Sequence, residues 1–357
     1  MSVSVFDHPW LAALLGDEEV ARHFSAEAEL HAMLEFEVAL AMAEAEAGII
    51  PAEAAQAIGA AALTFQPDLQ TLAAGTARDG MVVPVWVRQL REAVGPPHGD
   101  HVHFGSTSQD VLDTSLILRL RPVLGILATR LNAFDARLTT LAAEHGAVAA
   151  MARTRMQRAL PITWADRIAA WRAPLARHQK RLQELAPRLL VVQFGGPVGT
   201  LDKFGDRGPS VAAALARRLD LAVPGTCWHS ARDMLADFAG WLSSLTGSLG
   251  KIGQDIALLA QNEIAEVTVT GAGRSSAMHH KQNPVLAEIL VTLARYNATQ
   301  LSAMHHALVH EQERSGTAWT LEWMIVPPMV AATGAALARG TALLDAVQIT
   351  QSRSLAP

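Results

Sequence analysis

The stretch LGILATRLNAFDARLTTL (residues 124–141) decides the fold class of this chain. Its larger apolar side chains are spaced three and four residues apart, at Leu124, Leu127, Leu131, Phe134, Leu138 and Leu141. This spacing places them in one stripe along one face of a helix. A stripe of this length must be buried against another apolar surface, so the segment predicts a long helix inside a bundle.

Two segments farther along the chain repeat the pattern. One stripe consists of Trp164, Ile168, Trp171, Leu175, Leu182 and Leu185, and another of Phe238, Trp241, Leu245, Leu249, Ile252, Ile256 and Leu259. Three such stripes predict an all-α protein with a central bundle of long, roughly antiparallel helices. Only LLVVQFGG (189–196) reads as a short strand.

The N-terminal part predicts a different organisation. Ser25 is a good N-cap, and the helix that it starts should end at Gly48, before Pro51. Shorter helices follow to about residue 100. We therefore expect a small helical domain at 1–100, the long-helix bundle at 101–345 and a short tail at 346–357.

Composition excludes several classes of protein. Half of the 357 residues are hydrophobic and the net charge is −5, which argues against a nucleic-acid binder. The single cysteine, Cys227, can form neither an internal disulfide nor a zinc site by itself. The N-terminus lacks the basic region of a signal peptide, and the apolar stretch at 323–338 is interrupted by two prolines. A cytoplasmic protein that binds no membrane is expected.

Four polar segments lie between the apolar stripes, and the first is HVHFGSTSQDVLDT (101–114). It places His103, Thr107 and Ser108 just ahead of a predicted helix. Hydroxyl and backbone N–H groups at a helix N-terminus bind anions well. Simple helix capping is the alternative explanation, although capping does not require the histidine.

The next two polar segments are weaker signals. MARTRMQRALPITW (151–164) contains Arg155 and Gln157, and CWHSARD (227–233) contains Arg232. The guanidinium group suits carboxylates. A solvated basic turn in the first segment and a structural Arg–Asp pair in the second are the competing interpretations.

The fourth segment is GAGRSSAMHHKQNPV (271–285). Its glycines give backbone freedom, and its serines, histidines, Lys281 and Asn283 offer a proton carrier and donors for an anion. A neutral serine is a poor base and would need a positive environment to ionise. A flexible surface loop is the alternative.

These segments resemble conserved regions of the fumarase/aspartase superfamily. SSAMHHKQNPV is similar to its SSxMPxKxNP loop, HFGSTSQDVLDT to its first conserved region and MARTRMQRALPIT to its second. The lyases of the superfamily carry a proton-transferring His where this chain has Arg155. The 3-carboxy-cis,cis-muconate cycloisomerase subgroup also lacks this His. This chain resembles that subgroup in three further motifs, TSQDVLDT, CWHSARD and HEQERSGTAWTLEW (310–323).

Other departures concern the substrate and the end of the chain. His279 replaces the usual Pro of the loop and Arg274 its second Gly, so a sulfonated muconate is a second candidate substrate. Many relatives continue into a third helical domain, which is expected to be missing or vestigial here.

The resemblance implies a reaction and a set of residues. A carboxylate of a polycarboxylate substrate adds across a double bond to close a lactone, without a metal or organic cofactor. Ser275 would carry the proton and His280 would tune it. The substrate would be held by Lys281, His103, Thr107, Ser108, Arg155, Gln157, Arg232, Ser276 and Asn283. The resemblance further implies a homotetramer in which each active site is shared between subunits.

Three alternatives remain open from sequence. One is a fumarate-releasing lyase of the argininosuccinate or adenylosuccinate type, and another is a non-catalytic helical structural protein. The third is a metal site in HHALVH (305–310), where His306 and His310 would lie one helical turn apart.

Overall fold

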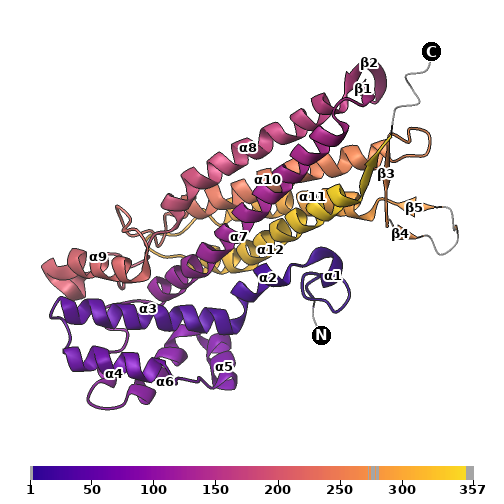
Figure 1. The fold of residues 1–357 in the computed structure, drawn as a ribbon. Helices are drawn as coiled ribbons and strands as arrows, with labels where there is room; N and C mark the ends of the chain where they lie inside the picture. The colour runs from indigo at the N-terminus through magenta and orange to yellow at the C-terminus, as the bar shows by residue number, and fades with distance from the viewer. Residues whose placement is uncertain (1–2, 272, 275–277, 279–280, 351–357) are drawn as a thin grey trace.

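The computed structural model describes residues 3–271, 273–274, 278 and 281–350. It consists of an elongated bundle of long helices with a layer of shorter helices packed against one end (Figure 1). The described part is mostly helical, as the apolar stripes predicted. The bundle helices are α7 (Ser108–His145), α8 (Trp164–Leu189), α10 (Asp233–Leu259), α11 (Val285–His306) and α12 (Gly316–Ala346).

The three predicted stripes form the interior of this bundle. Every residue of the stripes falls in α7, α8 or α10 and is buried. Helix α12 is apolar enough to resemble a membrane span, but 67% of its most hydrophobic window is buried inside the protein. It is therefore a core helix, which neighbours cover on most of its surface.

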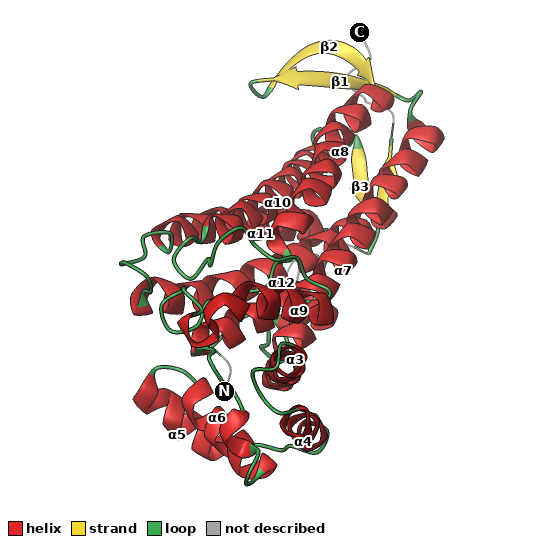
Figure 2. Ribbon diagram, turned by 90° about the vertical axis from the view of Figure 1, so that its left-hand side faces the viewer, coloured by secondary structure: helices red, strands yellow, loops and turns green. Residues whose placement is uncertain are grey.

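The layer of shorter helices is built on α3, which packs against α4, α7 and α9 (Figures 1 and 2). Ser25 caps α3 as predicted, because its Oγ accepts a hydrogen bond from the backbone N–H of Ala28 at 3.1 Å. Helices α1 and α2 instead contact the bundle helices α11 and α12. The short helices are α1 (Ala12–Leu15), α2 (Glu18–Ala21), α3 (Ala26–Glu46), α4 (Ala52–Ala62), α5 (Leu69–Asp79), α6 (Val83–Val94) and α9 (Gly208–Leu219).

The prediction of strands was wrong. Segment 189–196 forms only an isolated bridge between Val191 and Ala222. Elsewhere in the described residues there are three two-stranded antiparallel sheets, and the largest is a hairpin whose turn has Arg155 and Met156 at φ 50° and 67°. The strands are β1 (Ala149–Thr154), β2 (Gln157–Thr163), β3 (Val267–Val269), β4 (Gly273–Arg274), β5 (Gln282–Asn283) and β6 (Val347–Ile349), and they pair as β1–β2, β3–β6 and β4–β5.

The bundle has two ends that carry different polar segments. The near end is defined here by the N-termini of α7 and α10, and the far end by the C-termini of the same helices together with the β1–β2 and β4–β5 hairpins. Helix α10 has 27 residues, so at about 1.5 Å per residue it separates the two ends by about 40 Å. Figure 1 shows both hairpins on the side of the bundle away from α3 and α9.

Candidate functional site

The near end begins at the N-terminus of α7, where the sequence predicted an anion site. Helix α7 starts at Ser108, with Thr107 as its N-cap residue, so the predicted helix start is confirmed. Both side chains are half-buried. The backbone N–H of Thr107 donates to Asp110 Oδ2 at 3.1 Å, which fixes the entry of the chain into the helix.

Asp110 organises this end by binding three separate segments. Its carboxylate accepts the backbone N–H groups of Gly195 and Gly196, each at 2.9 Å, and contacts His229 Nε2 at 2.7 Å. All of this is buried. Burial alone would lower the pKa of His229, but the hydrogen bond to Asp110 and the neighbouring Cys227 raise it to about 9. An imidazolium–carboxylate pair therefore lies under the Thr107 turn at neutral pH.

Arg232 is held differently from the sequence expectation. Its guanidinium is fully buried and forks onto two carboxylates: Nη1 and Nη2 donate to Asp113 at 2.5 and 3.0 Å, and Nε donates to Glu322 at 2.9 Å. Burial opposes the charge, but both acids raise the pKa of Arg232. Because its donors are occupied inside the protein, this placement does not support a role as a substrate clamp. Arg232 instead ties α10 to α7 and α12.

His103 has a carboxylate partner that the sequence did not reveal. Glu37 on α3 is buried, accepts the backbone N–H of His103 at 3.1 Å, and contacts its Nδ1 at 2.5 Å. His103 has φ 61°, in the left-handed region that non-glycine residues rarely adopt. Burial, with the charge of Glu37, raises the pKa of the neighbouring Glu44 to about 9. Glu44 is therefore protonated at neutral pH.

Arg314 adds an exposed cation to this end. Its Nη2 donates to the carbonyl oxygen of Pro197 at 2.7 Å, one residue after the Gly195–Gly196 pair that Asp110 binds. Arg314 lies within HEQERSGTAWTLEW (310–323), but it was not among the site residues predicted from the sequence. Its signal was weak, because one arginine ahead of the Ser315 cap of α12 is common in surface turns.

At the far end, the β1–β2 turn carries two of the predicted residues. Arg155 and Gln157 are exposed, and within the described part of the chain their side chains have no hydrogen-bond or ion-pair partner. The neighbouring Arg153 is anchored, because it binds the buried Glu266 at 2.8 Å. The turn is thus held at its base while its tip faces outward.

The β4–β5 hairpin carries Lys281 and Asn283. Lys281 is exposed and its backbone N–H donates to the carbonyl of Met278 at 3.0 Å, while Asn283 is half-buried in β5 and pairs with Gly273. The predicted residues Ser275, Ser276 and His280 lie outside the described residues.

The predicted residues therefore fall into two groups within one chain. His103, Thr107, Ser108 and Arg232 lie at the near end, and Arg155, Gln157, Lys281 and Asn283 lie at the far end, about 40 Å away along α10. A single small substrate cannot contact both groups of one chain. Helix α11 ends at His306, so His306 and His310 do not share a helical turn, and the described residues contain no group of three or more His, Cys, Asp or Glu placed to hold a metal.

Comparison with known proteins defines the family. A family model described as a lyase matches residues 17–296. The chain belongs to the fumarase/aspartase family of lyases. It is 40% identical over 336 residues to a 3-carboxy-cis,cis-muconate cycloisomerase of Pseudomonas aeruginosa, covering 92% of this chain and 73% of the relative.

Solved structures show the same fold. The 3-carboxy-cis,cis-muconate lactonizing enzyme from Pseudomonas putida matches with a TM-score of 0.89 at 38% identity, over 96% of this chain and 77% of that one. A fumarate lyase from Mesorhizobium sp. BNC1 matches with a TM-score of 0.88 at 36% identity, over 94% and 76% of the two chains. An N-acetyl-S-(2-succino)cysteine lyase of Dickeya dadantii is 30% identical over 99% of this chain and 78% of its own. The chain is therefore 30–40% identical to family members that are named for different reactions.

Proposed function

We propose that this protein is a cycloisomerase that converts 3-carboxy-cis,cis-muconate to a carboxylated muconolactone in the cytoplasm, with 3-sulfomuconate as a second candidate substrate. The observation that carries the proposal is the 40% identity to a cycloisomerase over 92% of the chain. Arg155 supports it, because an arginine stays protonated at neutral pH and cannot replace the proton-transferring His of the lyases.

The reaction joins a carboxylate oxygen to one carbon of a double bond and adds a proton to the neighbouring carbon. The carboxylate beside that neighbouring carbon holds extra negative charge before the proton arrives. Catalysis then depends on cations and N–H donors directed at this charge, together with one proton donor. We assign the proton to Ser275, tuned by His280, and the charged oxygens to Lys281, Asn283 and Ser276.

The near end supplies the second half of the proposed site. Thr107 and Ser108 offer hydroxyl groups at a helix N-terminus. His103, whose imidazole is oriented by Glu37, lies four residues before Thr107 in the sequence. Arg314 replaces Arg232 in the proposal as the cation of this end, since Arg232 is neutralised by Asp113 and Glu322. Arg155 and Gln157 are retained as exposed contacts from the β1–β2 turn.

Because the two halves are about 40 Å apart in one chain, we propose that the far end of one subunit meets the near end of another. A homotetramer of antiparallel bundles would bring these ends together. The exposed polar residues of the far end would then face substrate and neighbouring subunits.

A fumarate-releasing lyase is the second candidate function. The 36% identity to a fumarate lyase over 94% of this chain favours it, and Arg155 argues against it.

Spectroscopy with 3-carboxymuconate tests the proposal directly. Purified protein should remove the diene absorbance, and Ser275→Ala should lower turnover by about 10²–10⁴-fold while circular dichroism stays unchanged. Release of fumarate from argininosuccinate or adenylosuccinate, without lactone formation, would instead support the lyase. Near-normal turnover in Ser275→Ala would remove Ser275 from the mechanism.

A further inference from the structure

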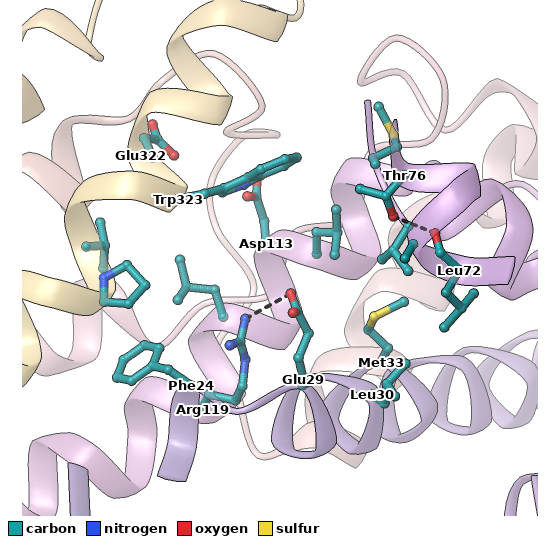
Figure 3. A pocket seen from close by; sticks show the side chains of 18 of the residues that line it. Phe24, Glu29, Leu30, Met33, Leu72, Thr76, Asp113, Arg119, Glu322 and Trp323 are labelled. Atoms are coloured by element: carbon teal, nitrogen blue, oxygen red, sulfur yellow. Dashed lines mark hydrogen bonds and ion pairs between the residues drawn. The ribbon is translucent and has the colours of Figure 1, made fainter. Parts of the chain in front are cut away.

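A cavity of about 530 Å³ lies between α3, α5, α7 and α12 (Figure 3). This volume falls within the range of about 300–1,000 Å³ that is typical of small-molecule sites. Most of its wall is apolar, with Leu30 and Met33 from α3, Leu72 from α5, and Trp323 and Val326 from α12. Of the sequence-predicted site residues that the structure describes, none lines it.

Four ionisable side chains line the cavity, and two of them, Asp113 and Glu322, share Arg232 as a counter-charge. Asp113 accepts two hydrogen bonds from Arg232 and one from Trp319 Nε1 at 2.9 Å. Glu322 accepts from the same guanidinium at 2.9 Å and lies 3.5 Å from His310. These two carboxylates are therefore bound to the interior of the protein.

The other two, Arg119 and Glu29, form a loose pair at one side of the cavity (Figure 3). Nη2 of Arg119 is 3.4 Å from Glu29 Oε1, and Nε donates to the carbonyl of Ser115 at 3.3 Å. Among the described residues, Nη1 has no hydrogen-bond partner. The Arg119 side chain is only 10% exposed, whereas that of Glu29 is 38% exposed.

Arg119 is thus a nearly buried cation with an incomplete counter-charge. Burial lowers its pKa, and Glu29 compensates only in part. A guanidinium binds a carboxylate best when two parallel N–H groups meet two oxygens, and Glu29 uses only one of these contacts. A second carboxylate inside the cavity would complete this geometry, and the half-exposed Glu29 can turn toward solvent.

We propose that this cavity binds an aromatic monocarboxylate, whose carboxylate pairs with Arg119 and whose ring packs against Leu30, Met33 and Trp323. The apolar wall selects the ring, and the unsatisfied N–H groups of Arg119 select the anion. The site differs from the proposed lactonising site, because its lining includes none of Thr107, Ser108 and Lys281.

Calorimetric titration with three matched probes tests the charge selection. Benzoate, benzamide and benzylamine share a ring and differ in the charge of the head group. The wild-type protein should bind benzoate about tenfold or more tightly than benzamide, and benzylamine least. Absence of benzoate binding, or tighter binding of benzylamine, would overturn the proposal, because the second result would show that Asp113 and Glu322 dominate.

Two substitutions at the ion pair should act in opposite directions. Arg119→Gln should weaken benzoate binding about tenfold or more, and Glu29→Gln should strengthen it, because the competing carboxylate is gone. Arg119→Lys keeps the charge in case the Gln variant folds poorly, and should retain part of the affinity. Arg121→Gln, two residues along the same helix, is the matched control, since Arg121 donates to the carbonyl of Leu219 and does not line the cavity.

Lys281→Ala separates this site from the proposed active site. It should leave benzoate binding unchanged even if it abolishes lactone formation. Benzoate binding that is lost in Lys281→Ala and kept in Arg119→Gln would overturn the proposal and assign the binding to the active site.

Discussion

The two ends of the bundle treat polar groups in opposite ways. At the near end, Asp110 is hydrogen-bonded to His229, and Asp113 and Glu322 to Arg232, and all five side chains are buried within one chain. At the far end, Arg155, Gln157 and Lys281 are exposed, and in the described part of the chain their side chains have no partner. The difference teaches that the near end is pre-organised by its own fold. The far end, beyond the buried Glu266 that anchors Arg153, offers groups for something outside the chain.

Removal of the buried arginine should have the largest effect. Arg232→Leu leaves Asp113 and Glu322 buried without their counter-charge, so the free energy of unfolding should fall by about 3–5 kcal/mol. Urea denaturation at pH 7 measures this. The matched control at the far end, Arg155→Leu, should change stability by no more than about 0.5 kcal/mol, since its side chain is exposed. Equal losses in both variants would erase the contrast between the ends.

The buried His229–Asp110 pair should make the near end sensitive to pH. The folded pKa of His229 is raised to about 9, above an unfolded value of about 6.5. Its contribution to stability is therefore fully present below about pH 6.5 and is lost as pH rises through 9. The stability difference between the wild type and His229→Gln should shrink by about 3 kcal/mol between pH 6 and pH 10. A difference that is independent of pH would contradict a charged imidazole.

Substitution at the far end should affect activity and leave stability intact. Lys281→Ala should lower turnover of 3-carboxymuconate by about 10²-fold, equivalent to about 2.7 kcal/mol, because a cation directed at the developing charge is lost. The urea midpoint should stay at the wild-type value, since Lys281 is exposed. A large loss of stability would instead show that the hairpin is structural.

Apart from the control variants, the smallest effect should come from the helix cap beside the β1–β2 hairpin. Thr163 Oγ accepts the backbone N–H of Asp166 at 3.2 Å, and the backbone N–H of Thr163 donates to Asp166 at 2.9 Å. Thr163→Ala should cost about 1 kcal/mol. Thermal unfolding with Thr163→Ser, which keeps the hydroxyl, provides the control. If Thr163→Ala lowered the free energy of unfolding as much as Arg232→Leu, the far end would contribute to stability as strongly as the near end, and the contrast would fail.

The sequence predicted the long helices well, because their stability comes from apolar periodicity that can be read locally. The stripe from Leu124 to Leu141 is buried along its whole length. The β1–β2 hairpin was missed, because its turn uses Arg155 and Met156 at positive φ and gives no Asn-Gly or Gly-Gly signal. Pro161 within β2 further obscured the strand pattern.

The candidate site was predicted by residue type but not by partner. The sequence could not show that Arg232 meets Asp113 and Glu322, which lie 119 and 90 residues away. For the same reason it could not show that Glu37 binds His103 across 66 residues. The sequence therefore identified which ionisable residues belong to the candidate site, and only the folded structure showed which carboxylates pair with them.

Mixing two inactive variants tests the central claim that each active site joins the far end of one subunit to the near end of another. Ser275→Ala and a near-end variant, Ser108→Ala with His103→Ala, would be purified separately, then unfolded and refolded together in equal amounts. If the residues come from different chains, some mixed sites carry neither defect, and lactone formation should return to about one quarter of the wild-type rate. Mixtures that stay as inactive as the separate variants, although they form the same oligomer, would contradict the account.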